Sequence, residues 1–303
     1  MHSDALDWLQ HYLLHLCEQR QLSPHTLSNY RRDLNAAVGW CDRHDIPAWQ
    51  DLDSQGVRNW SAESHRKGLG GRSIQRRLSA LRGFCQFLVE HKILEHNPAR
   101  DIRAPKSPRK LPHSLDVDRL QRLLECKPED WLEQRDLTLM ELMYSGGLRL
   151  SELVGLNIDD VNLQDGEARV LGKGRKTRIV PVGSKAKTAL AGWLPVRNLR
   201  ADENENALFI SRNGTRISPR SVQQRLKRWA LKQGLESRLH PHALRHSCAT
   251  HVLESSGDLR AVQELLGHAN LGTTQIYTHL DFQRLAQVYD TAHPRARKKH
   301  GPE

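Results

Sequence analysis

The sequence has no apolar run that approaches the length of a membrane helix, which needs about 20 apolar residues. Its first twenty residues carry acids where a secretion signal would have a basic start followed by an apolar block. Only five cysteines occur in 303 residues, far apart and without a Cys-x-x-Cys pair. These absences argue against a membrane-spanning protein and a disulfide-rich secreted one, and predict a cytoplasmic protein with reduced thiols.

Acidic residues are fewer than basic ones. The chain has 35 Asp and Glu and 46 Lys and Arg, which gives a formal net charge of +11. This charge favours a polyanionic partner such as nucleic acid or an anionic membrane surface. The sequence contains no GxxxxGKS/T phosphate loop and no HExxH zinc motif. Neither a nucleoside triphosphate site nor a helical zinc site of that type is therefore indicated.

Prolines divide the chain at residues 103–112, a run that holds three prolines and four basic residues. Neither a helix nor a strand interior tolerates this proline density, so we expect a basic linker. The linker separates a domain over 1–102 from a second domain over 113–292, with a basic tail over 293–303.

Apolar residues recur three or four positions apart along most of the chain, which predicts helices. Short alternating segments near 161–163, 168–171 and 178–182 predict a small antiparallel sheet in the second domain. The fold class is therefore mainly α with a small antiparallel β-sheet. The helices are expected over 4–20, after Pro24, from Ser54, and over 73–91, 114–126, 131–145, 150–156, 184–199, 218–233, 241–255, 258–266 and 282–290.

Basic side chains gather between residues 58 and 82, where seven arginines and lysines accompany one acid. A solvated helix face would look the same, but the strong net sign and the basic linker favour contacts to DNA phosphates. The candidate DNA-contact residues are Arg66, Lys67, Arg72, Arg76, Arg77, Lys106, Arg109, Lys110, Arg175 and Lys176.

Two basic residues of the second domain stand at turns. Arg149 follows Gly146 and Gly147, between two expected helices, where its planar fork could meet a phosphate. Lys173 lies on the tip of an expected hairpin, where its ammonium could protonate a leaving group. Taken alone, each residue is better explained as an exposed side chain.

Further along, His242 and Arg245 lie three residues apart on the first turn of an expected helix, where the helix dipole favours a bound anion. His268 follows the end of a helix, and Tyr277 comes nine residues later as a possible nucleophile. A tyrosine buried in the core is the plain alternative. His242 and His246 have the spacing of a metal pair, but no third ligand is evident, so we expect no metal and no other cofactor.

The order Arg, Lys, His-x-x-Arg, His, Tyr formed by these residues resembles the tyrosine recombinase (phage integrase) family, and within it the bacterial Xer site-specific recombinases. The stretches 253–260, 263–270, 277–283 and 293–296 carry the resemblance most specifically. It covers nearly the whole chain. It implies a two-domain, C-shaped DNA clamp, made of a helical SAM-like core-binding domain and a catalytic domain.

The resemblance also implies a reaction that cuts and rejoins DNA through a 3′-phosphotyrosyl intermediate, without ATP. It assigns the chemistry to six residues. These are Tyr277 as nucleophile, Arg149 and Arg245 on the non-bridging oxygens, Lys173 as the acid for the leaving 5′ oxygen, His242 as an aid to proton transfer at the tyrosine, and His268 as a donor to a phosphate oxygen.

The expected last helix, about 282–290, bears the partner-docking candidates Phe282, Leu285, Val288 and Tyr289. It could pack on its own domain, whereas the resemblance implies docking on a neighbouring protomer. The implied assembly is a heterotetramer on dif-like DNA sites, with two copies of this chain and two of a XerD-like partner. The implied task is resolution of chromosome and plasmid dimers at cell division, with a septal DNA translocase as activator.

Three other functions stay open. A phage or mobile-element integrase of the same family would have an additional arm-binding domain, for which we expect no room before the first helix. A catalytically silent DNA-binding regulator would show the same charge and helices, although all six positions are filled. A metal-dependent nuclease or phosphatase would need clustered carboxylates, and none lie near His242 or His268 in the sequence.

Overall fold

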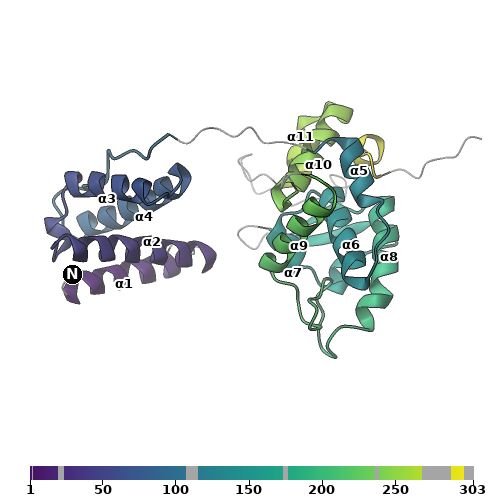
Figure 1. Cartoon of the computed structure of the whole chain (residues 1–303), viewed down its shortest axis with the longest axis horizontal. Helices are drawn as coiled ribbons and strands as arrows, with labels where there is room; N and C mark the ends of the chain where they lie inside the picture. Colours follow the sequence, from purple (N-terminus) through teal and green to yellow (C-terminus); the bar gives the residue numbers. More distant parts are fainter. Residues whose placement is uncertain are drawn as a thin grey trace, which may run out of the picture. The chain divides into compact units, whose positions relative to one another are not determined.

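The computed structural model describes residues 1, 3–19, 24–106, 115–172, 177–235, 239–267 and 288–296. The chain divides into two compact units, one up to residue 110 and one from residue 111 (Figure 1). Each unit has a hydrophobic core of its own. Residues 107–112 lie outside the described part, so the linker stays a prediction.

The first unit is helical. It consists of α1 (Ser3–Glu18), α2 (Pro24–Arg43), the 3-10 turn η1 (Trp49–Asp51), α3 (Ser54–Arg66) and α4 (Gly71–Glu90). α2 packs against α1 and α4, and α3 packs against α4. Asp53 starts α3 as its N-cap, because its carboxylate accepts a hydrogen bond of 2.7 Å from the Gly56 amide.

Arg82 of α4 fixes the chain that leaves this unit. Its guanidinium donates hydrogen bonds to the carbonyl oxygens of Ala99 (3.1 Å) and Ile102 (2.9 Å). The Asn97 amide in turn donates to the Arg82 carbonyl oxygen at 3.0 Å. This arginine of the basic run 58–82 therefore stabilises the exit from α4.

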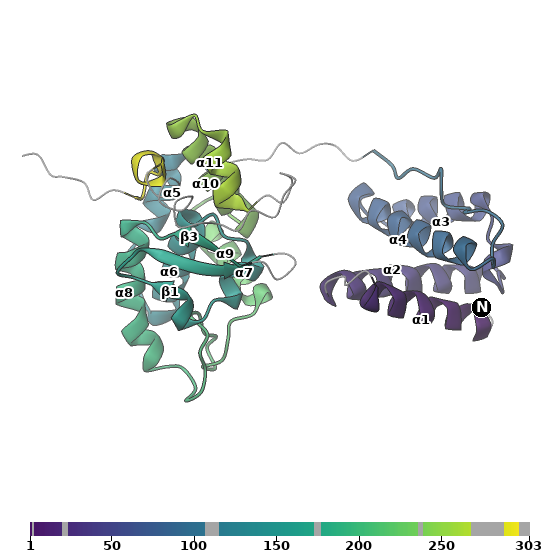
Figure 2. The same ribbon diagram turned by 180° about the vertical axis from the view of Figure 1, so that it is seen from behind.

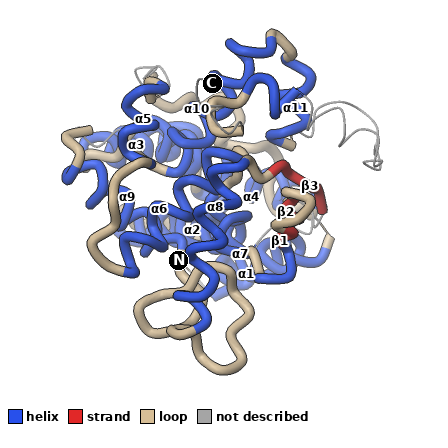
Figure 3. Tube along the Cα trace, turned by 90° about the vertical axis from the view of Figure 1, so that its right-hand side faces the viewer, coloured by secondary structure: helices blue, strands red, loops and turns tan. Residues whose placement is uncertain are grey.

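The second unit combines helices with one small sheet (Figure 2). Its helices are α5 (Val117–Leu124), α6 (Trp131–Ser145), α7 (Leu150–Gly155), η2 (Ile158–Asp160), α8 (Ser184–Asn198), α9 (Pro219–Lys232), α10 (Pro241–Ser256) and α11 (Leu259–Leu266). The strands β1 (Val161–Asn162), β2 (Glu167–Leu171) and β3 (Thr177–Pro181) form an antiparallel sheet in the order β1-β2-β3 (Figure 3).

α6 is the central helix of this unit, since it packs against α8 and α10 and is buried from residue 135 to its end. The inward residues of the sheet, among them Val170 and Val180, join the same core. The predicted fold class, mainly α with a small antiparallel sheet, is confirmed. No helix in the described part of the chain is both long and apolar enough to span a bilayer.

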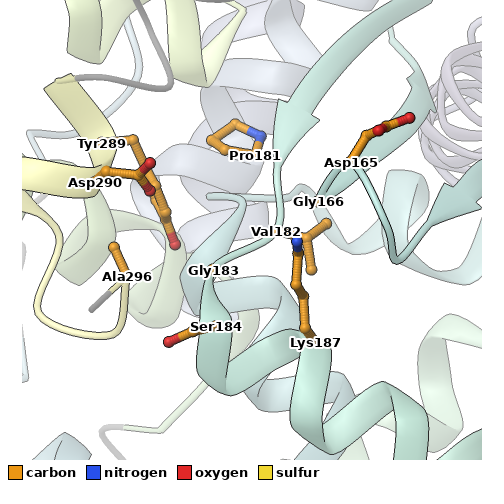
Figure 4. Close-up of a pocket in the computed structure, with 10 residues that line it drawn as sticks. All are labelled: Asp165, Gly166, Pro181, Val182, Gly183, Ser184, Lys187, Tyr289, Asp290 and Ala296. Atoms are coloured by element: carbon orange, nitrogen blue, oxygen red, sulfur yellow. The ribbon is translucent and has the colours of Figure 1, made fainter. Parts of the chain in front are cut away.

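Residues 288–296 return to this core, and residues 288–292 are helical. Tyr289 is only 1 % exposed, and its hydroxyl lies 2.6 Å from the Ser145 hydroxyl at the end of α6. Tyr289 and Asp290 line one side of a pocket of about 190 Å³, and Ser184 and Lys187 of α8 line the other (Figure 4). The segment is therefore anchored beside the start of α8.

This position corrects the prediction that Tyr289 docks on a partner, because its ring is a core residue of its own unit. Val288 packs against the same core and is partly buried. The other two docking candidates, Phe282 and Leu285, lie outside the described residues.

Arg295 is buried as well, although the predicted basic tail begins at residue 293. Its guanidinium donates to both carboxylate oxygens of Glu141 on α6, at 3.1 and 2.6 Å, and to Glu125 at 3.1 Å. Buried arginines need such anionic partners. The tail prediction is therefore corrected at its start, because residues 293–296 belong to the folded unit.

Candidate active site

A sharp turn after α6 places Arg149 at the start of α7. Gly147 has a φ of +58°, and a Cβ there would lie 3.1 Å from Leu266 and 3.3 Å from Cys248. Only glycine fits this backbone without strain. The turn therefore brings the end of α6 close to α10 and α11, with Arg149 directly behind it.

The Arg149 side chain is about one third exposed and is held at two places. It donates to the Glu152 carboxylate at 2.7 Å and to the Gly267 carbonyl oxygen at 3.3 Å. The Arg149 amide also donates to Glu152 at 2.8 Å, which is the glutamate half of a capping box at the start of α7. The Arg149 guanidinium is thus fixed, while part of it stays accessible to a ligand.

Arg245 comes from α10 and reaches the same turn. Its guanidinium donates to the carbonyl oxygens of Gly147 (2.5 Å) and Leu266 (2.6 Å), and the residue is 9 % exposed. Burial, together with the positive charge of Arg149, lowers the pKa of Arg245 to about 10. It still carries its charge at neutral pH, beside a second arginine, which favours a bound anion.

Glu152 is the buried counter-charge of the cluster. It accepts two hydrogen bonds from Arg178 of β3, at 2.7 and 3.0 Å, in addition to those from Arg149, and it lies 3.9 Å from Arg245. Burial alone would raise its pKa, but the hydrogen bonds from Arg178 and from the Arg149 amide outweigh it and hold the pKa at about 2. One carboxylate therefore faces three guanidiniums, so the cluster keeps an excess of positive charge.

His242 lies on the first turn of α10, three residues before Arg245, and is exposed. His240 caps this helix, because its Nδ1 accepts a hydrogen bond of 3.0 Å from the Ala243 amide, and Pro241 follows it. The described residues thus present a partly exposed guanidinium at Arg149, and an exposed imidazole on the helix that carries the buried Arg245. Such a set can bind an oxyanion and stabilise added negative charge on it.

Residues 113–284 match the phage integrase family, and residues 9–92 match the N-terminal SAM-like domain of phage integrases. The tyrosine recombinase XerC of Pseudomonas syringae pv. syringae (strain B728a) is 53 % identical over 292 residues, which cover 96 % of this chain and 97 % of that protein. The tyrosine recombinase XerC of Escherichia coli O127:H6 (strain E2348/69 / EPEC) is also 53 % identical, over 298 residues, which cover 98 % of each chain.

The chain belongs to the phage integrase family.

Solved structures of a site-specific recombinase and of a transposon integrase have a similar fold. The XerH site-specific recombinase in a pre-cleavage complex with difH substrate has a TM-score of 0.67 and 25 % identity, over 91 % of this chain and 82 % of that one. The Tn1549 transposon integrase in complex with transposon right end DNA has a TM-score of 0.72 and 17 % identity, over 92 % and 98 % of the two chains. The predicted family, and the predicted enzyme class of site-specific DNA recombinase, are confirmed.

Within this phage integrase fold, the structure brings together two of the six predicted catalytic residues, Arg149 and Arg245, at the α6–α7 turn, and His242 lies exposed on the first turn of α10, three residues before Arg245. The other three, Lys173, His268 and Tyr277, lie outside the described residues. The segments leading to them are defined, because Gly172 follows β2 and Gly267 ends α11. In the described part of the chain, no cluster of three or more His, Cys, Asp or Glu residues could hold a metal ion.

The predicted DNA-contact residues divide into three groups. Arg66, Lys67, Arg72 and Lys106 are exposed, although Lys67 also forms an ion pair of 2.5 Å with Glu63. Two arginines are paired with the buried Asp33 instead, Arg76 at 2.8 Å and Arg77 at 3.7 Å. Arg109, Lys110, Arg175 and Lys176 lie outside the described residues.

Sequence reasoning missed Glu152 and Arg178. Glu152 stands three residues after Arg149, the spacing of a capping box, and this signal could have been read. Arg178 occupies an inward position of β3, next but one to the buried Val180. A buried arginine on a strand needs a carboxylate partner, but the sequence does not say which one.

Gly267 ends α11 with a φ of +63°, directly before His268. Gly267→Ala should lower the free energy of unfolding by about 1–2 kcal/mol, because an L-residue is strained in the left-handed region. A Cβ there would also lie 3.0 Å from Arg178 Nε. Urea unfolding would measure the change. Gly155→Ala is the control, because nothing lies within 4 Å of its Cβ position, and equal effects of the two substitutions would contradict the prediction.

Proposed function

We propose that this recombinase cuts a DNA strand with Tyr277 as nucleophile and rejoins strands through a 3′-phosphotyrosyl intermediate. The observation that carries this is the pair Arg149 and Arg245. Both guanidiniums are fixed by the carbonyl oxygens of residues 147, 266 and 267, at the end of the helix that leads to His268. Two fixed guanidiniums can hold an oxyanion, and the chain continues from Gly267, beside them, toward Tyr277.

In the proposed cleavage step the Tyr277 oxygen attacks the scissile phosphorus, and the bond to the 5′ oxygen breaks. The phenol proton passes toward His242, and Lys173 gives a proton to the departing 5′ oxygen. Arg149 and Arg245 stabilise the charge on the non-bridging oxygens, and His268 donates to one of them. Because the arginines are held in place beforehand, little reorganisation is needed when charge builds up. The rejoining step reverses these transfers with a 5′-hydroxyl from the other strand.

The DNA substrate is proposed to contact both units. The exposed cations of the first unit, Arg66, Arg72 and Lys106, supply charge for phosphate contacts that do not read sequence. Binding through them should weaken as salt rises, because each phosphate contact releases counterions. The SAM-like match over residues 9–92 supports a DNA-binding role for this unit.

We further propose that the chain acts as a XerC-type subunit, two copies pairing with two copies of a XerD-like partner on a dif-like site in the cytoplasm. Its task would be resolution of chromosome and plasmid dimers, with a septal DNA translocase as activator. The identity of 53 % to recombinases named XerC, over 96–98 % of the chain, supports this assignment. The Tn1549 integrase shares only the fold at 17 % identity, so it gives little support to a mobile-element role.

Covalent trapping tests the proposed chemistry. A duplex carrying the recombination site with a nick just beyond the scissile phosphate loses its short fragment after cleavage, which strands the enzyme on the DNA. Wild-type protein, with the partner recombinase and a chelator present, should form an adduct that resists denaturant, whereas Tyr277→Phe should bind equally well and form none. Tight binding by wild type without an adduct would instead support the silent DNA-binding regulator.

A further inference from the structure

Arg178 is a buried guanidinium to which the proposed reaction gives no task. It lies on β3, is 6 % exposed, and grips both oxygens of Glu152, at 2.7 and 3.0 Å. The two residues are 26 positions apart in the chain. The pair therefore ties β3 to α7, whose first turn carries Arg149.

The third guanidinium nitrogen of Arg178, Nε, has no carboxylate partner among the described residues. Arg178 Nε is buried and makes no hydrogen bond within the described part of the chain. It faces the end of α11, because a Cβ on Gly267 would lie 3.0 Å from Nε, 3.1 Å from Cδ and 3.2 Å from Cζ. The Gly267 peptide thus lies directly against the side of the guanidinium, and His268 is the next residue.

Gly267 is held from a second direction by Arg149, which donates to its carbonyl oxygen at 3.3 Å. The same Glu152 carboxylate orients Arg149 from its other side. Arg178 therefore contacts both groups that fix Arg149. One is the Glu152 carboxylate, and the other is Gly267, whose carbonyl oxygen accepts a hydrogen bond from Arg149.

We infer that Arg178 is a positioning residue, which sets the Glu152 carboxylate and the Gly267 turn so that Arg149 addresses the scissile phosphate. This inference rests on the proposed function of Arg149. The planar guanidinium of an arginine can position both groups, whereas a lysine cannot, because one ammonium cannot bind both carboxylate oxygens and also contact the Gly267 peptide.

The test measures single-turnover adduct formation on the nicked duplex at saturating protein, with DNA affinity measured separately in a Tyr277→Phe background. Arg178→Lys should slow adduct formation at least tenfold and change DNA affinity less than twofold. Arg197→Lys is the matched control. Arg197 is also buried, at 5 % exposure, and donates to the Ala207 carbonyl oxygen at 3.1 Å, remote from the turn. It should match the stability loss of Arg178→Lys and keep the wild-type rate.

A substrate with sulfur in place of the bridging 5′ oxygen separates two explanations, because a thiolate leaves without a proton. Arg178 lies five residues after Lys173, so a fault in the Lys173 hairpin could also slow cleavage. If Arg178 positions Arg149, the sulfur substrate should leave the Arg178→Lys rate slow, whereas it should restore the rate of Lys173→Ala.

Three outcomes would overturn the inference: an unchanged rate for Arg178→Lys, a rate loss matched by lost affinity, or restoration of Arg178→Lys by sulfur. Failure of the proposed function looks different. In that case the wild-type chain forms no adduct, or Tyr277→Phe still forms one.

Discussion

Glu152→Gln should lower the free energy of unfolding by about 3–5 kcal/mol, because removing one partner of a buried ion pair leaves the others uncompensated. The glutamine keeps the size of the side chain but turns one acceptor oxygen into a donor. That amide would face Arg178 or Arg149, which are both donors. Strand cleavage should also fall by at least tenfold, because Arg149 loses the carboxylate that fixes its fork. Urea unfolding and adduct trapping measure the two effects.

The pH dependence of stability gives this prediction a second readout. The pKa of Glu152 is about 2 in the folded chain, below the value of about 4.3 for an unperturbed glutamate. The stabilising contribution of the ionised carboxylate is therefore complete above about pH 5 and is lost as the pH falls toward 2. The difference in stability between wild type and Glu152→Gln should narrow over that range.

Glu264→Gln is the matched control for Glu152→Gln. Glu264 pairs with Arg260 at 3.1 Å on the surface of α11, and its side chain is 23 % exposed. Surface pairs contribute about 0–1 kcal/mol, so this variant should unfold almost like wild type. A Glu152→Gln chain that is no less stable than Glu264→Gln would mean that the three arginines do not depend on this carboxylate.

The local signals in the sequence predicted the helices well. Where the sequence predicts a helix over 218–233, Ser218 caps α9, accepting a hydrogen bond of 3.1 Å from the Ser221 amide, and Pro219 takes the first helical position. Gly267 ends α11 in the left-handed region, directly after the helix predicted over 258–266. Caps, prolines and glycines act within one turn, so their effect can be read without the rest of the chain.

The connections between distant residues could not be predicted in this way. Arg245 binds the carbonyl oxygen of Gly147, 98 positions away, and Arg178 binds Glu152 across 26 positions. Charge and spacing identify Arg245 but not Arg178, and they indicate the partner of neither, because any carboxylate or carbonyl oxygen would satisfy an arginine. Arg76 and Arg77 show the same limit, since their pairing with the buried Asp33 competes with the predicted contact to DNA.

The second large effect is expected at the C-terminal anchor, where Arg295→Met should lower the free energy of unfolding by about 3–5 kcal/mol. Methionine fills most of the space but leaves the Glu141 carboxylate buried without the guanidinium that grips both its oxygens, at 3.1 and 2.6 Å. The double variant Arg295→Met/Glu141→Leu should recover part of the loss, because the uncompensated charge is then gone as well.

Urea unfolding of the full chain and its two variants tests the anchor, with Lys232→Met as control. Lys232 pairs with Glu129 and Glu133 at 2.7 and 2.9 Å on the surface, so its loss should cost little. If Arg295→Met is no more costly than Lys232→Met, residues 288–296 do not anchor the chain through this pair. If the predicted loss and its recovery are both seen, the stretch bearing Tyr277 is held at both ends by one unit, by the Gly267 turn before it and by Arg295 after it. Both ends of that stretch then lie on the unit that carries the arginine pair, Arg149 and Arg245.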